Sequence, residues 1–367
     1  MKAKILHVEA SNGWGGQEIR ILREAEGMRQ RGHEVFFAIM NGGILATRAR
    51  DKGFVVYELN FYRYAWLPTL FHLQRILSRH QIDIVNTHSS LDSWIGGIAA
   101  RLKGKKIIRT RHFSTAGKGG WNSRMLYGFL ADFVVTACTM VIQPISTQSG
   151  KPKNLFRALP TGVDPQQIEM GSEKDPSFRK HMGITDETFL IGTVCVMRSW
   201  KGVGDFIKAA AALKDRKEIK WVIVGGGHDE PYRKLVRDLQ LEENVFFTGH
   251  LENPFPAMQA LDAFALLSTA NEGVPQSAQQ AAYLGKPLIA TPTGGLAEIC
   301  IDGVTGLQVP AFDPSAVASA VIKLKEDRSM GYRLGAKGRA LILERYTFQQ
   351  TLDGTEEVYR EILQDRK

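Results

Sequence analysis

The sequence has few cysteines: Cys138, Cys195 and Cys300 are the only three in 367 residues. They stand far apart in apolar or small-residue surroundings, and no zinc-type spacing links them. We therefore expect three buried thiols in a reducing compartment, the cytoplasm.

Long apolar runs are also missing. The first ten residues, MKAKILHVEA, have no apolar core and no cleavage site, so they predict a first strand rather than a signal peptide. The best candidate for a membrane span, residues 126–145, carries Asp132 and several polar side chains. We interpret it as a helix, a buried strand and a second helix.

Acidic residues are scarce in the first half of the chain. Residues 1–160 hold 23 lysines and arginines against 10 acidic residues, a net charge of +13, whereas residues 161–367 hold 24 against 28, or −4. A basic face of that size attracts nucleic acid, anionic lipid headgroups or a phosphorylated acceptor. A generally basic, soluble surface is the alternative.

Strand-like runs alternate with helical stretches along the whole chain, which predicts parallel sheets built from βαβ units. The length fits two domains. The fold class is therefore α/β, with two doubly wound domains in series. The expected strands are residues 5–8, 35–38, 55–59, 82–87, 107–110, 133–137 and 156–159, and then 189–196, 221–224, 245–248, 263–267 and 287–290.

The polar, turn-rich segment 159–188 separates the two sets of strands. We place a first domain at residues 1–165 and a second at 166–346. Residues 347–367 form a helical stretch with no strand after it, and we expect this helix to cross back onto the first domain.

Glycine-rich turns follow strands in both halves. Gly15 and Gly16 stand between the first strand and a helix, where free N–H groups favour an anion. A plain tight turn is the alternative. The dinucleotide pattern is broken because Glu18 stands where its third glycine would be, which disfavours a nicotinamide oxidoreductase. Gly249 ends a later strand, where a backbone contact to a base and simple packing are equally plausible.

Cations and histidines cluster at expected strand ends, the edge where open α/β sheets bind ligands. Arg198 and Lys201, in the run VMRSWKG, can converge on one phosphate. A solvated basic turn is the alternative, although Trp200 gives this turn an apolar anchor. His88 and His112 end two strands of the first half, where lone structural histidines are also common, and the two arginines of the run RTRH lie beside His112.

The segment from Ser268 to Glu298 places two polar side chains on one loop and helix. Glu272 lies in a turn before an alanine-rich helix, and Gln280 follows eight positions later. A buried strand and a second glycine-rich turn come next. We expect a ligand with both hydroxyls and phosphates.

Taken in order, the runs GWGGQE, RTRH, TGVD, MRSWKG and EGVPQSAQQAAYLGKPLIATPTGGLAE resemble glycosyltransferase family four. The resemblance covers nearly the whole chain. It implies the GT-B fold, in which two Rossmann-like domains face a cleft. It also implies retaining transfer of a sugar from a nucleotide-diphosphate sugar to a glycan or glycolipid acceptor of the lipopolysaccharide-core type, with no metal and no cofactor.

The resemblance assigns roles residue by residue. Glu272 matches the acid that contacts the sugar, Arg198 and Lys201 match the cations that neutralise the departing phosphate, and His112 matches a histidine beside the reacting carbon. The donor-binding residues are Gly15, Gly16, Gly249, Leu251, Gly273, Val274, Pro275, Gln276 and Gln280. The acceptor-binding residues are His88, Arg109 and Arg111.

Two positions depart from the family. Gln280 replaces the glutamate that binds the donor ribose, so it hydrogen-bonds without charge, and the spacing from Arg198 to Lys201 is shorter than the common one. No second carboxylate stands ready as a nucleophile. We therefore expect an oxocarbenium-like path in which the leaving phosphate helps to deprotonate the acceptor.

The run from Phe61 to His80 mixes aromatic and basic residues around an amphipathic stretch, which suits an anionic membrane surface. A core-packed helix is the alternative. With the basic first half, the run favours a peripheral enzyme on the inner face of the cytoplasmic membrane. Rival functions are a nucleotide-sugar epimerase of the same fold and a non-enzymatic basic protein that binds nucleic acid or membrane. No nucleic-acid motif accompanies the charge, so we expect no nucleic-acid partner.

Overall fold

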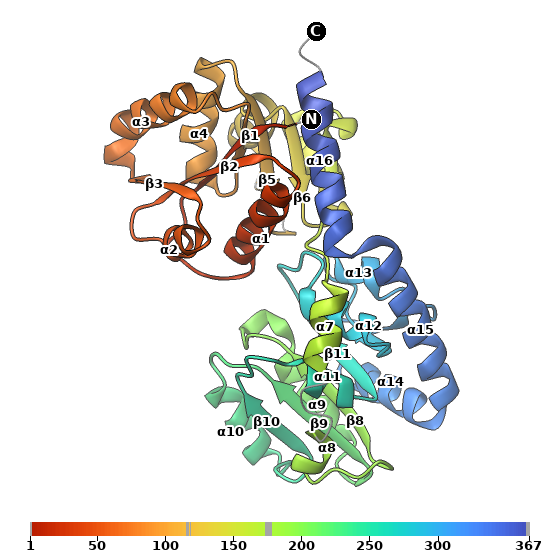
Figure 1. The fold of residues 1–367 in the computed structure, drawn as a ribbon. Helices are drawn as coiled ribbons and strands as arrows, with labels where there is room; N and C mark the ends of the chain where they lie inside the picture. Colours follow the sequence, from red (N-terminus) through yellow and green to blue (C-terminus); the bar gives the residue numbers. More distant parts are fainter. Residues whose placement is uncertain (1, 115–116, 118, 173–177, 365–367) are drawn as a thin grey trace. The chain divides into compact units, whose positions relative to one another are not determined.

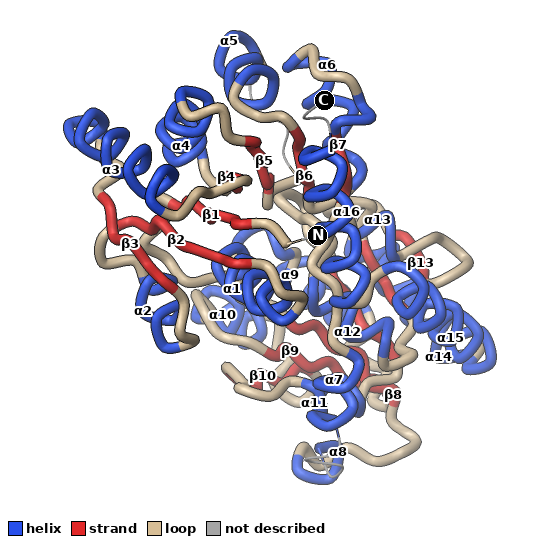
Figure 2. The backbone as a smooth tube through the Cα atoms, turned by 45° about the horizontal axis from the view of Figure 1, so that its top comes forward, coloured by secondary structure: helices blue, strands red, loops and turns tan. Residues whose placement is uncertain are grey.

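The computed structural model of the chain describes residues 2–114, 117, 119–172 and 178–364 (Figure 1). It forms two compact units: residues 1–160 with 350–367, and residues 161–349. Part of the predicted linker, residues 173–177, lies outside the described residues. Strands and helices alternate along the chain in both units (Figure 2).

Unit 1 is built on a seven-stranded sheet in the order β3-β2-β1-β4-β5-β6-β7, and every pairing is parallel. All seven strands predicted for the first half are confirmed. The order reverses between β1 and β4, which makes this a doubly wound sheet with a switch point between them. The strands are β1 Lys4–Glu9, β2 Glu34–Met40, β3 Val55–Leu59, β4 Ile84–Thr87, β5 Lys106–Arg111, β6 Phe133–Thr136 and β7 Phe156–Ala158.

The helices of unit 1 connect these strands. The helical segments are α1 Gly16–Gln30, α2 Ile44–Asp51, η1 Arg63–Ala65, α3 Trp66–Arg79, α4 Ser90–Leu102, α5 Gly120–Ser123, η2 Arg124–Phe129, η3 Thr139–Val141, α6 Ile142–Ser149, η4 Lys153–Leu155 and α16 Phe348–Gln364. Residues 126–145 are helix, strand and helix, as predicted. Within the described residues, no helix has both the length and the apolar character needed to cross a membrane.

The C-terminal helix α16 packs on unit 1, which confirms that it crosses back to the first domain. Its apolar face buries Leu352, Val358 and Tyr359, because these residues recur at helical spacing. On its polar face, Arg31 binds Asp353 at 2.6 Å and Glu356 at 2.9 Å. A Cβ on Gly27 of α1 would clash with Leu352, so glycine lets the two helices approach closely.

Unit 2 is built on a six-stranded parallel sheet in the order β10-β9-β8-β11-β12-β13. The strands are β8 Phe189–Val194, β9 Ile219–Val224, β10 Val245–Gly249, β11 Ala263–Leu266, β12 Leu288–Ala290 and β13 Gly306–Gln308. The helical segments are α7 Pro165–Ser172, α8 Phe178–His181, η5 Ser199–Lys201, α9 Val203–Ala212, α10 Glu230–Asp238, α11 Phe255–Ala260, α12 Gln276–Tyr283, α13 Leu296–Ile299, α14 Pro314–Glu326 and α15 Arg328–Arg345.

The five predicted strands of the second half are confirmed, and β13 is the one that sequence reasoning missed. Parallel strands buried on both faces consist of near-continuous apolar runs, as in the IKWVIV of β9. Strand β13 has the sequence Gly-Leu-Gln, with one large apolar residue between a glycine and a polar side chain, so it shows no such run. In the core, Trp221 of β9 packs edge-on against Phe206 of α9, with ring centroids 4.9 Å apart.

Gly202 connects the turn η5 to helix α9 and brings that turn against the end of β11. Its φ is +71°, a left-handed conformation that side chains disfavour. A Cβ on Gly202 would also clash with the carbonyl oxygen of Leu267, which is backbone and cannot give way. Because of this close approach, Lys201 lies beside the loop that follows β11.

We predict that Gly202→Ala lowers the free energy of unfolding of the full chain by about 2 kcal/mol or more, because strain and clash add. Gly204→Ala is the matched control, since a Cβ there meets nothing within 4 Å and the residue lies in α9. The control should be neutral or stabilising by up to about 1 kcal/mol. Urea unfolding of both variants measures this, and equal midpoints would contradict the prediction.

Candidate active site

The predicted donor-binding residues of unit 2 follow the carboxyl ends of neighbouring strands. The turn with Arg198 and Lys201 comes after β8, Gly249 ends β10, and Glu272 comes after β11. Backbone hydrogen bonds join these ends: the amide of Met197 donates to Gly226 and that of Gly225 to Gly249, both at 2.9 Å. The groups therefore gather at one edge of one sheet, where open α/β folds bind ligands.

Lys201 and Glu272 form an ion pair at this edge, although 71 positions separate them. The Nζ of Lys201 lies 2.5 Å from Oε1 of Glu272. Glu272 is only 4% exposed. The hydroxyl of Ser268 donates to the same oxygen at 2.6 Å. Both partners use Oε1, and within the described residues Oε2 has no hydrogen bond, so it can accept one from a ligand.

The loop from Gly273 to Pro275 lies against the second glycine-rich turn. The amide of Gly295 donates to the carbonyl of Glu272 at 3.3 Å. A Cβ on Gly295 would clash with the carbonyl of Gly273 and with Val274, so glycine permits this contact between the two loops. The packing fixes the backbone of the loop that follows Glu272. The family resemblance assigns the backbone amides of this loop to the sugar and the diphosphate.

The glutamines of helix α12 have different surroundings. Gln276, assigned to the donor, donates its side-chain amide to the carbonyl of Thr161. Gln279, which sequence reasoning did not single out, is fully buried and donates to the carbonyls of Thr161 at 3.1 Å and Val274 at 2.9 Å. Gln280 is partly buried and forms no side-chain hydrogen bond within the described part of the chain, so its amide is available to a ligand.

Arg198 and Leu251 complete the predicted donor set. The guanidinium of Arg198 is exposed and lies over the ring of Trp200, 5.2 Å from its centroid. The carbonyl of Trp200 accepts a bond from the amide of Thr269 at 2.8 Å, which ties the turn to the loop that carries Glu272. Leu251 is partly buried, just after β10.

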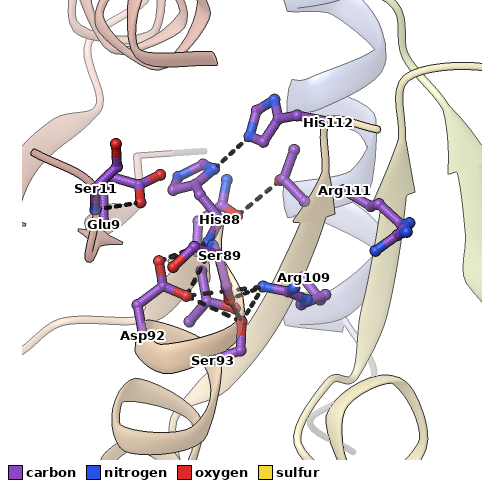
Figure 3. A network of polar contacts seen from close by, with 12 residues as sticks. Glu9, Ser11, His88, Ser89, Asp92, Ser93, Arg109, Arg111 and His112 are labelled. Atoms are coloured by element: carbon purple, nitrogen blue, oxygen red, sulfur yellow. Dashed lines mark hydrogen bonds and ion pairs between the residues drawn. The ribbon is translucent and has the colours of Figure 1, made fainter. Parts of the chain in front are cut away.

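The predicted residues of unit 1 lie at the carboxyl ends of β4 and β5 (Figure 3). Arg109 is 2% exposed; its guanidinium donates to the Ser89 carbonyl and the Ser93 hydroxyl and lies 3.7 Å from Asp92. These contacts hold the start of α4. Arg111 donates to the hydroxyl of Tyr127 at 2.7 Å.

A buried carboxyl that sequence reasoning missed, Glu9, connects this edge to the glycine-rich turn. Its oxygens accept hydrogen bonds from the amide of Ser11, at 2.8 Å, and from the side chain of Gln17. Burial, and then repulsion from Asp92, raises the pKa of Glu9, and burial raises the pKa of Asp92. The only sequence signal was an acidic residue directly after the predicted apolar strand 5–8.

The turn itself is held by the side chain of Glu18. The amide of Gly15 donates to Oε2 of Glu18 at 2.9 Å, and α1 begins at Gly16. Glu18, which breaks the dinucleotide pattern, is therefore the capping residue of this helix. A Cβ on Gly16 would meet nothing within 4 Å, so open space adjoins the first turn of α1.

His88 and His112 contact each other at the same edge, with Nδ1 of His88 3.1 Å from Nε2 of His112 (Figure 3). Burial lowers the pKa of both imidazoles well below the usual value. The guanidinium groups of Arg20 and Arg109 lower the pKa of His112 further. Both rings are therefore neutral at physiological pH and act as hydrogen-bonding groups rather than cations.

The chain has two doubly wound parallel sheets, and its terminal helix returns to the first unit. An acid and two cations lie at the edge of the second sheet. These features define a glycosyltransferase of the GT-B fold. Two protein-family models match the chain. The family "Glycosyl transferases group 1" matches residues 174–341, and the family "Glycosyltransferase Family 4" matches residues 14–167. The chain belongs to glycosyltransferase family 4.

Relatives agree with this family. The chain is 23% identical to the N-acetyl-alpha-D-glucosaminyl L-malate synthase of Bacillus anthracis, over 93% of this chain and 92% of the relative. It is 27% identical to the GDP-mannose-dependent alpha-(1-6)-phosphatidylinositol monomannoside mannosyltransferase of Mycolicibacterium smegmatis, over 76% of each chain. The crystal structure of HepE from Anabaena in complex with UDP superposes with a TM-score of 0.86 at 21% identity, covering 98% and 100% of the two chains, and shares the fold.

We predict that Lys201→Ala lowers the free energy of unfolding by about 2–4 kcal/mol, because it leaves the buried carboxylate of Glu272 without its cation. Arg198→Ala, in the same turn but exposed, should change stability by no more than about 0.5 kcal/mol. Adding Glu272→Gln to Lys201→Ala should recover part of the loss. Calorimetry of the four proteins tests this; an undiminished stability of Lys201→Ala would show that the pair is not coupled.

Proposed function

We propose that the protein is a retaining glycosyltransferase that uses a nucleotide-diphosphate sugar. The observation that carries the proposal is the Lys201–Glu272 pair, which leaves Oε2 of Glu272 open toward a ligand at the strand edge. A carboxylate that is held by a lysine and a hydroxyl on one oxygen can bind sugar hydroxyls with the other. The family match and the UDP complex of HepE support such a donor.

Charge stabilisation comes from Arg198 and Lys201. Negative charge grows on the leaving phosphate as the glycosidic bond breaks, and preorganised cations stabilise that charge. The exposed guanidinium of Arg198 is free to turn from Trp200 to a phosphate, whereas Lys201 is already fixed by Glu272. The proposal assigns this task to the two side chains and requires no metal.

Retention follows from an oxocarbenium-like path in which the leaving phosphate takes the proton of the acceptor hydroxyl. A double displacement of the glycosidase type would need a carboxylate nucleophile paired with an acid. Glu272 is instead paired with Lys201 and Ser268, and a carboxylate so held binds hydroxyls better than it attacks carbon. Gln280 supplies an uncharged hydrogen bond to the donor ribose.

The acceptor that we propose is a lipid-linked glycan, of which a lipopolysaccharide core is one example. The support comes from α3, where Tyr64 just before the helix is 81% exposed, Leu67 67% and Phe71 66%. Arg75 and Lys103 line the same surface depression as Phe71. Apolar side chains beside cations suit the interface of an anionic bilayer, so we place the enzyme in the cytoplasm, bound peripherally to the membrane.

The relatives mark the two alternatives for the acceptor. The mycobacterial relative acts on a phosphatidylinositol monomannoside, which is a lipid, and the Bacillus relative is a synthase of a glucosaminyl L-malate, which is a small anion. The apolar face of α3 favours the lipid. An acceptor assay with both classes distinguishes them.

We predict that Glu272→Ala lowers the rate of sugar transfer by a factor on the order of 10² to 10³, since the hydroxyls of the sugar lose their carboxylate. The same substitution at Glu326, exposed at the end of α14, should leave the rate unchanged. The purified chain is incubated with a panel of nucleotide sugars and acceptors, with and without EDTA, and the anomeric configuration of the product is read by NMR.

Near-normal transfer by Glu272→Ala would contradict the assignment of this residue. Inversion at the anomeric carbon would overturn retention, and loss of activity in EDTA would overturn metal independence. Rearrangement of the donor without any acceptor would favour the epimerase instead.

We predict that the chain binds vesicles that contain acidic lipids at low salt and dissociates as salt rises. Leu67→Ser with Phe71→Ser should weaken binding tenfold or more, on the order expected from losing two inserted apolar side chains. Tyr332→Ser is the control, because Tyr332 is 75% exposed but lies on α15 of unit 2. Co-sedimentation measures the effect, and equal binding by all variants would exclude α3 as the contact.

A further inference from the structure

Three histidines form a continuous chain through unit 1. His7 lies in β1, His88 follows β4 and His112 follows β5, and these three strands are neighbours in the sheet. Nδ1 of His7 is 2.9 Å from Nε2 of His88, and Nδ1 of His88 is 3.1 Å from Nε2 of His112. His7 is fully buried and His88 nearly so, whereas His112 is the member that reaches the surface.

The rings meet edge to edge, which is the geometry of a hydrogen bond between two ring nitrogens. The ring planes of His7 and His88 differ by 12°, and the ring centroids are 5.2 Å apart. This centroid distance exceeds the nitrogen–nitrogen distance of 2.9 Å by about two ring radii, so the two nitrogens lie on the line between the centroids. The lone pair of each nitrogen lies in the ring plane, so the bond runs along it. The rings of His88 and His112 are close to this arrangement, with an angle of 35° between their planes and 5.3 Å between their centroids.

Neutral rings restrict where the protons can be. Each neutral imidazole carries one proton and accepts at its other nitrogen. Both hydrogen bonds form only if all three protons are on Nδ1 or all three are on Nε2. In the second case, the Nε2–H of His7 would be buried, and within the described residues that nitrogen has no partner.

The first arrangement is favoured because an orphaned buried N–H is costly and rare, and an unused acceptor less so. Burial lowers the pKa of His7 to about 3, so this ring does not take up a second proton and has only the two neutral tautomers. Phe37 stacks beside His7 at 5.5 Å and offers no acceptor.

We propose that His7, acting through His88, fixes His112 in the tautomer that carries its proton on Nδ1, so that His112 presents a hydrogen-bond donor at the strand edge. His7 and His88 are then positioning residues. The consequence for catalysis rests on the proposed function: His112 would donate to an oxygen of the sugar and would not act as a base.

The experiment uses the full chain with histidines labelled at their ring nitrogens. Long-range nitrogen–proton NMR spectra show which nitrogen of each ring is protonated, and single substitutions assign the nine histidines. We expect His7, His88 and His112 all to be protonated on Nδ1. A proton on Nε2 of His112 in the unmodified protein would overturn the proposal.

Two variants of His7 test the chain itself. His7→Phe removes the donor beside Phe37, so His88 and His112 should become mixtures of both tautomers. His7→Asn places an amide N–H where Nδ1–H was and should restore the single tautomer. His72→Phe, on the exposed face of α3, is the control and should change neither ring. An unchanged His112 in His7→Phe would overturn the role of His7, and if that variant fails to fold, His7→Asn and the unmodified protein still decide the tautomer.

Kinetics separate a positioning role from a structural one. We expect His7→Phe to lower kcat about tenfold, with the KM for the donor little changed and with recovery in His7→Asn. If His7→Phe has a normal kcat although His112 is a mixture of tautomers, the role of the His112 tautomer in catalysis is overturned. If the unmodified protein transfers no sugar, the proposed function fails, and the NMR spectra still decide the tautomer.

Discussion

The ion pair between Lys201 and Glu272 is the contact on which the site of unit 2 depends. Two charges taken from water are stable only when they are paired and hydrogen-bonded, and here the hydroxyl of Ser268 adds a second hydrogen bond to the carboxylate oxygen that Lys201 binds. The pair forms because the left-handed backbone of Gly202 brings one turn against Leu267. Glycine at position 202 thus allows the close approach that places Lys201 beside Glu272.

Unit 1 treats its charges differently. Arg109 is buried against Asp92, and Arg20 lies 3.7 Å from Glu24 with both side chains buried, so these internal charges compensate each other. The histidines at the same edge are neutral. The excess of +13 in residues 1–160 therefore belongs to the surface, where it steers ligands from a distance.

Most of the strands can be predicted from the sequence, because buried parallel strands are apolar runs that stand out without an alignment. Of the thirteen strands in the described part of the chain, twelve were predicted, and β13 was missed because its sequence, Gly-Leu-Gln, has only one large apolar residue. The sequence also indicated that Lys201 and Glu272 follow strands. It could not indicate that they touch, since their contact depends on which strands are neighbours and on the φ of Gly202.

Side-chain partners were the least predictable part of the site. Gln279 and Gln280 are adjacent in sequence, but a helix turns them to different surroundings, so one is buried on two carbonyls and the other is open. Arg109 was expected to meet an acceptor, and its guanidinium lies among Ser89, Asp92 and Ser93. Its role toward an acceptor stays a prediction. His7 gave no signal, because a histidine inside an apolar strand has the pattern of a core residue.

The neutrality of the histidines is consistent with the reaction that we propose. In an oxocarbenium-like transition state the sugar ring gains positive charge while the leaving phosphate gains negative charge. A cationic imidazole against the ring would raise that barrier, whereas a neutral N–H donor can hold a hydroxyl without opposing the charge. Burial and the fields of Arg20 and Arg109 keep His112 neutral. The proposal therefore assigns the stabilisation of the phosphate to the cations Arg198 and Lys201 and a neutral hydrogen bond to His112, and each type of donor suits the charge that develops beside it.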